Sequence, residues 1–351
     1  MKTSSAGECA SWHVALDATY SVGDNLSGVG VYSREISAGL ARAHPESRFL
    51  YCYRPHRLLR SFSESLPPNA RRRLLWNGAP GSADLFHGLN QRLDRRYRRA
   101  VATFHDLFVL TGEYSTPEFC ARFAAQARSA AERADLVIAV SEFTARQVET
   151  LLRVERGRIR VIPHGVRAAV SGSVEREPIV LFVGAIQKRK NVSRLVKAFE
   201  LVPPGWKLFL VGSVGYGAGT ELAAVEQSPR RGDITVTGYV DNAELEKLYS
   251  RASVFAFPSL DEGFGIPVLE AMARGLPVLT ANASALPEVA GDAALLVDPN
   301  DFESIAAGLC RLIEDAEFRA ELSRKGLERS RAYTWQAAAD ATWRVYSELM
   351  G

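Results

Sequence analysis

The sequence predicts an α/β protein made of two doubly wound domains that face each other across a cleft. Three observations predict this fold. Apolar strands alternate with amphipathic helices along the chain, a pattern typical of parallel sheets that are covered on both faces. The alternation stops at a polar segment, residues 167–178, and then starts again. The 351 residues also exceed what one hydrophobic core ordinarily organises.

The first predicted domain covers residues 1–170 and begins with a strand at 13–19. The loop "YSVGDNLSGVG" follows, and then a helix from about Val31 to Ala43 in which apolar residues form one stripe. A second helix is expected over 116–134. The remaining predicted strands are 84–88, 100–106, 134–141 and 159–165. Most of them end at a glycine or a polar residue, which is where parallel sheets of this kind bind ligands.

The second predicted domain covers residues 171–330. Its strands are expected at 179–185, 206–213, 233–240, 252–259, 277–282 and 293–299. The turn "QKRKN" leads into a helix, and Asn191 is well placed to cap its N-terminus. From about Ser304 the chain is almost wholly helical. Residues 331–351 predict an amphipathic helix that returns to the first domain, so the fold is two Rossmann-like βαβ domains with a C-terminal helix that bridges them.

The composition is that of an ordinary globular protein, with 47% hydrophobic and 24% charged residues. No apolar run approaches the ~18 residues that a membrane span needs. The N-terminus lacks the apolar segment of a signal peptide, so we expect a cytoplasmic protein. The cysteines lie far apart and form no metal-binding or disulfide pattern, and we interpret all of them as structural or incidental: Cys9, Cys52, Cys120 and Cys310.

The net charge of +3 conceals an asymmetry between the two halves. Residues 1–170 contain 24 Lys and Arg against 16 Asp and Glu (+8), and residues 171–351 contain 19 against 24 (−5). The basic residues of the first half cluster at 71–73 and 94–99. This surface could bind an anionic lipid, and hence the inner membrane, or it could bind an anionic acceptor. The alternative is an arginine-rich surface that is only solvated. Nucleic acid is not expected, because no aromatic residues are interleaved with the charges in a binding motif.

Two glutamates flank a glycine-rich turn at the end of a predicted strand. In "PSLDEGFGIPVLEAM", Glu262 and Glu270 lie on either side of "GFG", and Pro267 suits the first turn of a helix. Glu270 is then expected in that first turn. Backbone N–H groups at a helix start bind anions, and carboxylates accept hydrogen bonds from vicinal hydroxyls of ribose or hexose. The alternative for Glu270 is an acidic residue that stabilises the helix dipole.

A basic turn lies at the matching position of the preceding βα unit. Arg189 and Lys190 come just before Asn191, so the dipole of the next helix adds to their charge. Preorganised cations at this point would stabilise the charge that develops on a departing diphosphate. The alternative is a solvated basic turn.

The C-terminal half resembles the donor site of the retaining glycosyltransferases of family four, which have the GT-B fold. Three stretches contribute to the resemblance: "PSLDEGFGIPVLEAMARGLPVLTANASALPEVAGDAALLVDP" with its E-x7-E spacing, "GYVDNAELEKLYSRASVFAFPS", and "LFVGAIQKRKNVSRLVKAF". The likeness is patchier in the first half. "HDL" and "RKN" are similar to motifs of the mannosyltransferase-like branch that builds bacterial lipopolysaccharide O-antigens.

The resemblance implies roles for individual residues of the second domain. Glu270 would bind the ribose hydroxyls of the nucleotide, and Glu262 would face the donor hexose near its 3- and 4-hydroxyls. Arg189 and Lys190 would neutralise the diphosphate. The backbone N–H groups around the turn would hold the sugar or phosphate: Gly263, Phe264 and Gly265. By the same resemblance, Gly184 would also belong to the donor site. Some members of the family have arginine directly after this glycine, and here the residue is Ala185. Neutralisation of the diphosphate would therefore depend more on Arg189 and Lys190.

The first domain contributes fewer residues. The segment "SGVGVYSREI" resembles the family's first loop, in which Gly28 and Gly30 would let backbone amides approach the donor phosphate or the acceptor. By resemblance, His105 in "TFHDLF" would contact the donor sugar near its 6-hydroxyl and the reaction centre, or else be a satisfied strand-end histidine. Asp106 would orient its loop. His164 is interpreted as a conformational residue beside Gly165.

The resemblance implies a retaining hexosyltransferase that moves a sugar from a sugar nucleotide, GDP-mannose in the first place, to a saccharide or polyprenyl-diphosphate-linked acceptor. A UDP-hexose or dTDP-rhamnose donor is the alternative. The chain contains no D-x-D triplet for a bridging metal, so we expect no metal and no cofactor beyond the co-substrate. The alternative functions are a GT-B epimerase, a non-catalytic sugar-nucleotide binder and a dehydrogenase. The dehydrogenase is disfavoured because the chain lacks a full dinucleotide-binding fingerprint.

Overall fold

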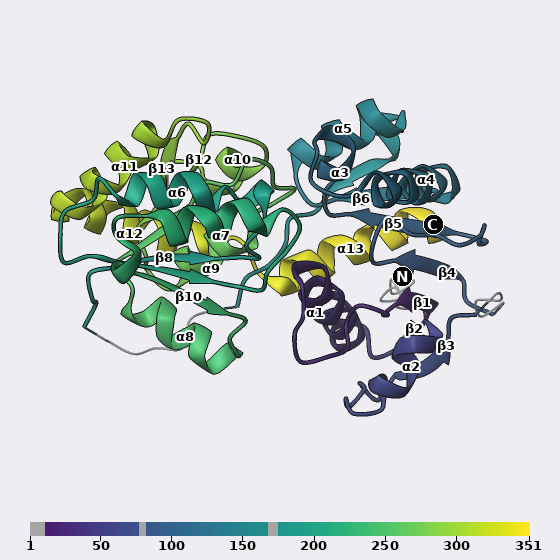
Figure 1. Ribbon diagram of the computed structural model, residues 1–351. Helices are drawn as coiled ribbons and strands as arrows, with labels where there is room; N and C mark the ends of the chain where they lie inside the picture. The colour runs from purple at the N-terminus through teal and green to yellow at the C-terminus, as the bar shows by residue number, and fades with distance from the viewer. Residues whose placement is uncertain (1–10, 77–81, 168–174) are drawn as a thin grey trace.

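The computed structural model describes residues 11–76, 82–167 and 175–351. In these residues the chain forms two α/β lobes side by side (Figure 1). The predicted fold class is confirmed, since each lobe contains a parallel sheet covered by helices. Cys9 and residues 168–174 of the expected linker lie outside the described residues. The described cysteines, Cys52, Cys120 and Cys310, are free thiols.

The N-terminal sheet has the strand order β3-β2-β1-β4-β5-β6-β7, and every adjacent pair is parallel. Its strands are β1 (His13–Asp17), β2 (Arg48–Tyr53), β3 (Ala70–Leu74), β4 (Leu85–Gly88), β5 (Ala100–Phe104), β6 (Leu136–Ala139) and β7 (Ile159–Val161). The sequence pattern did not predict β2 or β3. β3 is an edge strand of sequence "ARRRL", whose backbone pairing with β2 outweighs the low strand preference of its arginines.

The helices of this domain are α1 (Gly28–Ala43), α2 (Pro55–Ser61), α3 (Phe108–Thr111), α4 (Pro117–Arg133) and α5 (Glu142–Leu152). They cover both faces of the sheet: alternate residues of β1 pack in different clusters, Val14 and Leu16 on one face and Ala15 on the other. The expectation that the first helix begins near Val31 is wrong. Ser27 caps α1 through the backbone N–H of Gly30 at 3.3 Å, so the helix begins at Gly28.

The C-terminal sheet has the order β10-β9-β8-β11-β12-β13 and is also parallel. Its strands are β8 (Ile179–Val183), β9 (Lys207–Val211), β10 (Ile234–Gly238), β11 (Val254–Phe257), β12 (Val278–Ala281) and β13 (Leu295–Val297). Its helices are α6 (Val192–Phe199), α7 (Ala218–Gln227), α8 (Asn242–Arg251), α9 (Ile266–Ala273), α10 (Leu286–Ala290), α11 (Phe302–Glu314) and α12 (Ala316–Ser330). One continuous apolar cluster forms the core of this domain.

The last helix, α13 (Trp335–Met350), crosses to the N-terminal domain as expected (Figure 1). Its apolar stripe joins the core formed by α1 and the N-terminal sheet. The hydroxyl of Tyr346 lies 2.6 Å from His87 Nδ1, inside the domain. Burial of each large side chain of α13, such as Tyr346 and Val345, is worth ~1.5–3 kcal/mol. The packing of α13 therefore connects the C-terminal domain, which precedes it in the chain, to the N-terminal domain.

In both sheets the strand order reverses at the centre, between β1 and β4 and between β8 and β11. Loops that leave adjacent strands in opposite directions open a crevice at the carboxyl ends of those strands, where α/β proteins bind ligands. The two domains contact each other at this level: Thr111 Oγ1 donates to Asp261 Oδ2 at 3.1 Å, and Glu288 accepts from the backbone N–H of Glu142 at 2.8 Å. The candidate residues are therefore placed between the domains.

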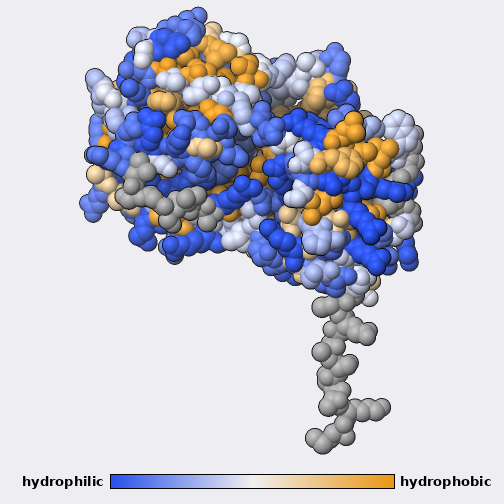
Figure 2. Space-filling model, turned by 90° about the horizontal axis from the view of Figure 1, so that it is seen from below, coloured by the Kyte–Doolittle hydropathy of each residue, from blue (hydrophilic) through white to orange (hydrophobic). Residues whose placement is uncertain are grey.

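The surface is mostly hydrophilic, with hydrophobic patches between the polar residues on the face shown in Figure 2. α2 belongs to the lower side of the molecule in Figure 1, the side from which Figure 2 is seen. Within the described ranges, no helix combines the length and apolar character that a membrane crossing requires.

Candidate active site

Two cations and one carboxylate converge after the central strands of the C-terminal sheet. Arg189 Nη1 lies 2.9 Å from Glu262 Oε2, and Lys190 Nζ lies 2.5 Å from Glu262 Oε1. All three side chains are about nine-tenths buried. The hydroxyl of Ser259 also donates to Glu262 Oε1 at 2.6 Å. Residues that the sequence placed 72 positions apart are thus one compact charged cluster.

The cluster sets the ionisation of its members. Burial disfavours the charged form of Glu262, but the positive charges of Arg189 and Lys190 outweigh that effect and lower its pKa to about 2. Burial lowers the pKa of Lys190 to about 8, with the repulsion of Arg189 adding to it and the attraction of Glu262 opposing it. At neutral pH the cluster is therefore a carboxylate held by two cations. Such a carboxylate cannot donate a proton and is a weak nucleophile.

The cations stand on a 3₁₀ turn, Lys188–Lys190, which follows β8. Asn191 is the N-cap residue of α6, as expected, but its side chain makes no capping hydrogen bond to the helix. Asn191 has a left-handed backbone (φ 61°), and its side-chain amide donates to the carbonyls of Pro258 and Pro299 at 3.0 and 2.7 Å. It thereby holds the basic turn to the loop after β11. Glu221 satisfies the helix start instead, accepting from the Ser193 N–H at 2.6 Å.

The "GFG" turn is pressed against the N-terminal domain. The carbonyl of Gly263 accepts hydrogen bonds from the hydroxyls of Ser141 (2.7 Å) and Thr144 (3.0 Å). A Cβ at position 263 would lie 1.8 Å from the carbonyl oxygen of His105, so only glycine permits this approach. Gly265, at φ 110°, is the N-cap residue directly before α9, and the ring of Phe264 packs edge-on to His164 at 4.9 Å.

Glu270 lies on α9, but not in its first turn, which corrects the sequence-based expectation. The helix begins at Ile266, so Glu270 is the fifth residue and projects from the second turn. Pro267 does lie in the first turn, as predicted. The hydroxyl of Tyr249, a buried residue of α8, donates to Glu270 Oε2 at 3.0 Å. Burial raises the pKa of Glu270, although Arg274 and this hydrogen bond oppose the effect. The helix dipole therefore does not explain its presence.

Gly28 and Gly30 lie in the first turn of α1, not in a loop. A Cβ on Gly28 would lie 3.6 Å from Ile266 Cδ1, so the starts of α1 and α9 face each other across the domain boundary. A Cβ on Gly30 would meet the carbonyl of Tyr20 at 2.8 Å. Because both helix starts present N–H groups and partial positive charge, they enclose a position suited to an anion.

Gly184 follows β8 and lies beside the basic turn, since a Cβ on it would be 3.6 Å from Lys190 Cε. The residues that the resemblance assigns to the donor site in the C-terminal domain thus form two neighbouring groups: the cation–carboxylate cluster with Gly184, and the "GFG" turn with α9.

The imidazole of His105 is oriented into the N-terminal domain. Its Nε2 lies 2.9 Å from the carbonyl of Leu89, and its Nδ1 lies 3.4 Å from His164 Nε2. Burial lowers its pKa to about 4, so the ring is neutral at physiological pH. The backbone of His105 meets the "GFG" turn, whereas its ring stacks with His164 at 5.3 Å. The structure therefore places His105 at the site boundary without joining its ring to the charged cluster.

Several residues of the site were not identified from the sequence. Phe108 of α3 lies under the Arg189 guanidinium at 4.3 Å, and Ser284 accepts from the N–H of Glu262 at 2.9 Å. Asp106, for which the sequence predicted only an orienting role in its loop, also lies next to this cluster, and burial raises its pKa to about 6. Ser259 follows β11, and a search of strand ends could have found it. Phe108 and Ser284 have no local signal, because each acts through a partner far away in the sequence.

Two family models match the chain and together cover most of it. "Glycosyltransferase Family 4" matches residues 26–170, and "Glycosyl transferases group 1" matches residues 167–329. The boundary between the two matches falls at the junction of the two α/β domains.

The chain is also similar to proteins of known name and structure. It is 31% identical over 286 residues to O-antigen chain mannosyltransferase B of Escherichia coli, covering 76% of this chain and 74% of that protein. Its fold is similar to that of sucrose-phosphate synthase from Thermosynechococcus elongatus, with a TM-score of 0.77, 23% identity and coverage of 97% and 99%. It is also similar to HepE of Anabaena in complex with UDP and glucose, with a TM-score of 0.73, 18% identity and coverage of 96% and 99%.

Proposed function

The chain belongs to the GT-B glycosyltransferases, and from this premise we propose that it is a retaining, metal-independent mannosyltransferase of bacterial cell-surface polysaccharide synthesis. The donor is GDP-mannose, and the acceptor is an oligosaccharide, free or lipid-linked. The proposal depends on one observation: Arg189 and Lys190 both form ion pairs with Glu262, close to the N-termini of α1 and α9, which face each other. The similarity to an O-antigen mannosyltransferase supports the choice of sugar.

The proposed mechanism needs no enzyme nucleophile. The diphosphate of the donor lies near the starts of α1 and α9, where Arg189 and Lys190 can turn from Glu262 toward it. As the bond from the anomeric carbon to the phosphate oxygen breaks, these cations stabilise the negative charge that develops on that oxygen. The acceptor hydroxyl attacks the same face, and its proton passes to the departing phosphate. Glu262, with a pKa of about 2, orients the sugar hydroxyls as an acceptor of hydrogen bonds.

Nucleotide binding tests the proposal most directly. We would measure thermal stability with GDP, UDP, dTDP, ADP and NAD. A ligand at ~100 times its Kd adds about 2.7 kcal/mol to the free energy of unfolding, which shifts Tm by a few degrees. We expect the largest shift with GDP. A shift with UDP or dTDP alone would assign a UDP-hexose or dTDP-rhamnose donor, and a shift with NAD alone would contradict the glycosyltransferase mechanism.

Turnover separates catalysis from binding. We expect transfer of mannose with retention at the anomeric carbon, with activity unchanged by EDTA. Loss of activity in EDTA with recovery on Mg²⁺ would contradict metal independence. Sugar-nucleotide conversion without an acceptor would indicate an epimerase, and binding without transfer or hydrolysis would indicate a non-catalytic binder.

Glu270→Ala is expected to weaken nucleotide binding by about 10- to 100-fold, because a carboxylate that accepts hydrogen bonds from hydroxyls contributes ~1.5–3 kcal/mol. Calorimetric titration with GDP measures the change. Tyr249→Phe, which removes only the hydroxyl that orients Glu270, should give a smaller decrease. Unchanged affinity in Glu270→Ala would remove this residue from the ribose site.

The pH dependence of kcat/KM should report Lys190. This parameter reflects the free enzyme, in which the pKa of Lys190 is about 8, so kcat/KM should fall as pH rises through 8 and the ammonium loses its proton. In Lys190→Arg the charge persists, and the alkaline limb should move to higher pH. A limb that stays near pH 8 in Lys190→Arg would assign it to another group.

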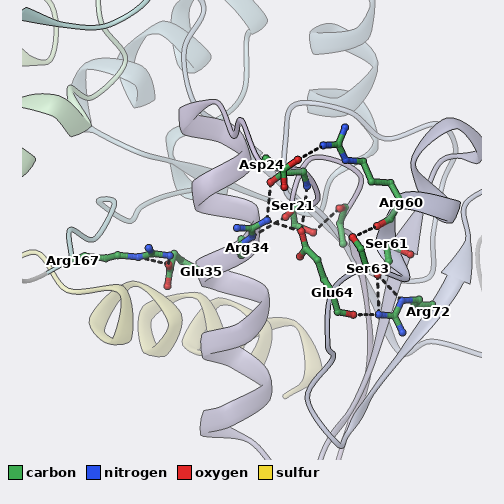
Figure 3. A network of polar contacts seen from close by, with 12 residues as sticks. Ser21, Asp24, Arg34, Glu35, Arg60, Ser61, Ser63, Glu64, Arg72 and Arg167 are labelled. Atoms are coloured by element: carbon green, nitrogen blue, oxygen red, sulfur yellow. Dashed lines mark hydrogen bonds and ion pairs between the residues drawn. The ribbon is translucent and has the colours of Figure 1, made fainter. Parts of the chain in front are cut away.

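We also propose a peripheral contact with an anionic membrane through α2. Leu59 and Phe62 are 84% and 65% exposed and lie one helical turn apart, with Arg57 and Arg60 on the same short helix. Ion pairs connect α2 and the segment after it to the rest of the domain: Arg60 of α2 pairs with Asp24 at 2.8 Å, and Glu64 pairs with Arg34 at 2.6 Å (Figure 3). Exposed apolar side chains among arginines are typical of interfacial contacts.

Vesicle sedimentation checks this contact. The double variant Leu59→Ser, Phe62→Ser should bind phosphatidylglycerol vesicles at least tenfold more weakly than the native protein, because two apolar groups no longer enter the interface. Leu201→Ser, which alters an exposed leucine of the C-terminal domain, is the matched control. Equal binding of all three proteins would contradict the role of α2.

A further inference from the structure

The N-terminus of α5 binds two separate groups of the C-terminal domain. The backbone N–H groups of Glu142 and Phe143 donate to the carboxylate of Glu288 at 2.8 and 3.2 Å, one to each oxygen. Glu288 belongs to α10, on the side of the C-terminal domain that faces α5 (Figure 1). The hydroxyl of Ser141, the N-cap residue of α5, donates to the carbonyl of Gly263 at 2.7 Å. One helix start thus contacts both α10 and the "GFG" turn.

The electrostatics of a helix start explain why a carboxylate lies there. The first N–H groups of the 11-residue helix α5 have no partner within the helix, and the helix dipole adds partial positive charge. The acidic side chain in the first turn of α5 is engaged elsewhere, because Glu142 pairs with Arg156 at 2.9 Å. The N–H groups of that turn are therefore left for Glu288, which approaches from the other domain.

Glu288 is joined to the segment that contains the charged cluster. The N–H of Ala285 donates to the carbonyl of Glu262 at 3.2 Å, and the N–H of Glu262 donates to the hydroxyl of Ser284 at 2.9 Å. On the other side, Arg329 of α12 donates to the backbone carbonyl of Glu288 at 2.6 Å. Because α10 is held to both segments, a displacement of Glu288 from α5 would also displace the "GFG" turn from the N-terminal domain.

The surroundings of this contact are dry. Val140, directly before the cap of α5, belongs to the N-terminal domain but packs in the core of the C-terminal domain. Val140, Ser141 and Thr144 are fully buried. Leu286 of α10 packs against the backbone of Gly265, where a Cβ would lie 2.7 Å from Leu286 Cδ2. The contact therefore keeps water out of the domain boundary beside the "GFG" turn.

We propose that Glu288 is a positioning residue for glycosyl transfer: bound by the N-terminus of α5, it holds the closed arrangement in which the "GFG" turn meets His105. This inference rests on the proposed function. In an arrangement that opens, water replaces the acceptor hydroxyl at the anomeric carbon. The bond to the phosphate oxygen breaks, its electron pair stays on that oxygen, and a proton of the water passes to the phosphate. The products are free mannose and GDP, so the role of Glu288 is to favour transfer over hydrolysis.

The test compares transfer with hydrolysis, using saturating GDP-mannose and octyl α-mannoside as the acceptor. Glu288→Ala should lower the ratio of transfer to hydrolysis by about 10- to 100-fold, because two hydrogen bonds to a charged group are lost. The Kd of GDP, measured by calorimetry, should stay within about threefold, because the loss affects closure and leaves the cations and Glu270 in place. A fold that was merely weakened would lose Tm without changing this ratio.

Two further variants make the comparison specific. Glu288→Gln keeps the length of the side chain and one acceptor oxygen, so its ratio should lie between those of Glu288→Ala and the native protein, and it remains informative if Glu288→Ala does not fold. Asp292→Asn is the matched control: it removes a carboxylate four residues further on, 80% exposed and paired with Lys325 at 3.3 Å. Its ratio should be native.

Small-angle scattering of each protein with GDP gives a readout that does not depend on turnover. The radius of gyration should be larger for Glu288→Ala than for the native protein and Asp292→Asn. If the native protein transfers mannose and the ratio is unchanged in both Glu288 variants, the inference is overturned and the proposed function stands. If the native protein neither binds GDP nor transfers, the proposed function fails. Scattering without nucleotide then decides whether Glu288 holds the domains closed, and equal radii overturn that role.

Discussion

Lys190→Ala is expected to lower kcat by about 10²- to 10³-fold. The reason is that, in the proposed mechanism, the ammonium group is one of two cations that stabilise the departing diphosphate. Loss of one preorganised charge at a developing anion costs ~3–4 kcal/mol in the transition state. The effect should appear in kcat with saturating donor, because the charge on the leaving oxygen increases as the bond breaks.

Two variants separate this effect from a loss of folding. Lys190→Met keeps much of the side-chain volume above the ring of Phe257, which lies 4.6 Å from Nζ, and removes a buried charge. Its Tm should fall less than that of Lys190→Ala, because the side-chain volume is kept and Glu262 retains Arg189 and Ser259 as partners, while its activity falls like that of Lys190→Ala. Lys188→Ala, on the same turn, changes a half-exposed lysine that is 3.8 Å from Glu113. Its activity should be nearly native. If Lys190→Ala turned over within threefold of the native rate, Lys190 would have no place in the mechanism.

Gly263→Ala is expected to lower kcat/KM by about 10²-fold or more with a much smaller loss of stability. The new methyl group would overlap the carbonyl oxygen of His105, at 1.8 Å, so the "GFG" turn must withdraw from the N-terminal domain. Withdrawal also breaks the hydrogen bonds from Ser141 and Thr144 to the carbonyl of residue 263. A misplacement of about 1 Å between groups that act on one substrate costs about 10²-fold in rate.

The measurements are steady-state kinetics and thermal unfolding. Gly219→Ala is the control, since a Cβ at position 219 would have no atom within 4 Å. That variant should keep native activity. Gly263 has no side chain in the core, although Phe264 beside it belongs to the core of the C-terminal domain, and Gly263→Ala should still unfold cooperatively. Native kcat/KM in Gly263→Ala would mean that the turn does not need to contact His105 during turnover.

Local sequence patterns predicted much of the fold. Buried strands are short apolar runs that end at glycine or polar residues, and α6 and α13 carry apolar stripes at helical spacing; both signals depend only on neighbours in the chain. The same patterns missed β2 and β3, because β3 consists mainly of arginines and exists through its pairing with β2. They also placed Gly28 and Gly30 in a loop, although Ser27 starts α1 three residues earlier than expected.

Within the site, sequence determined which residue types stand at the strand ends: Glu262 and "GFG" after β11, and Arg189 and Lys190 after β8. Tertiary structure decided what these residues do with one another. The ion pairs of Glu262 exist because β8 and β11 are adjacent in the sheet, and adjacency of strands is set by the strand order as a whole. The side chain of Asn191 bridges two loops instead of capping a helix for the same reason: its partners come from distant segments. The orientation of His105 and the binding of Glu288 at the N-terminus of α5 likewise depend on long-range packing, about which a periodicity along the chain holds no information.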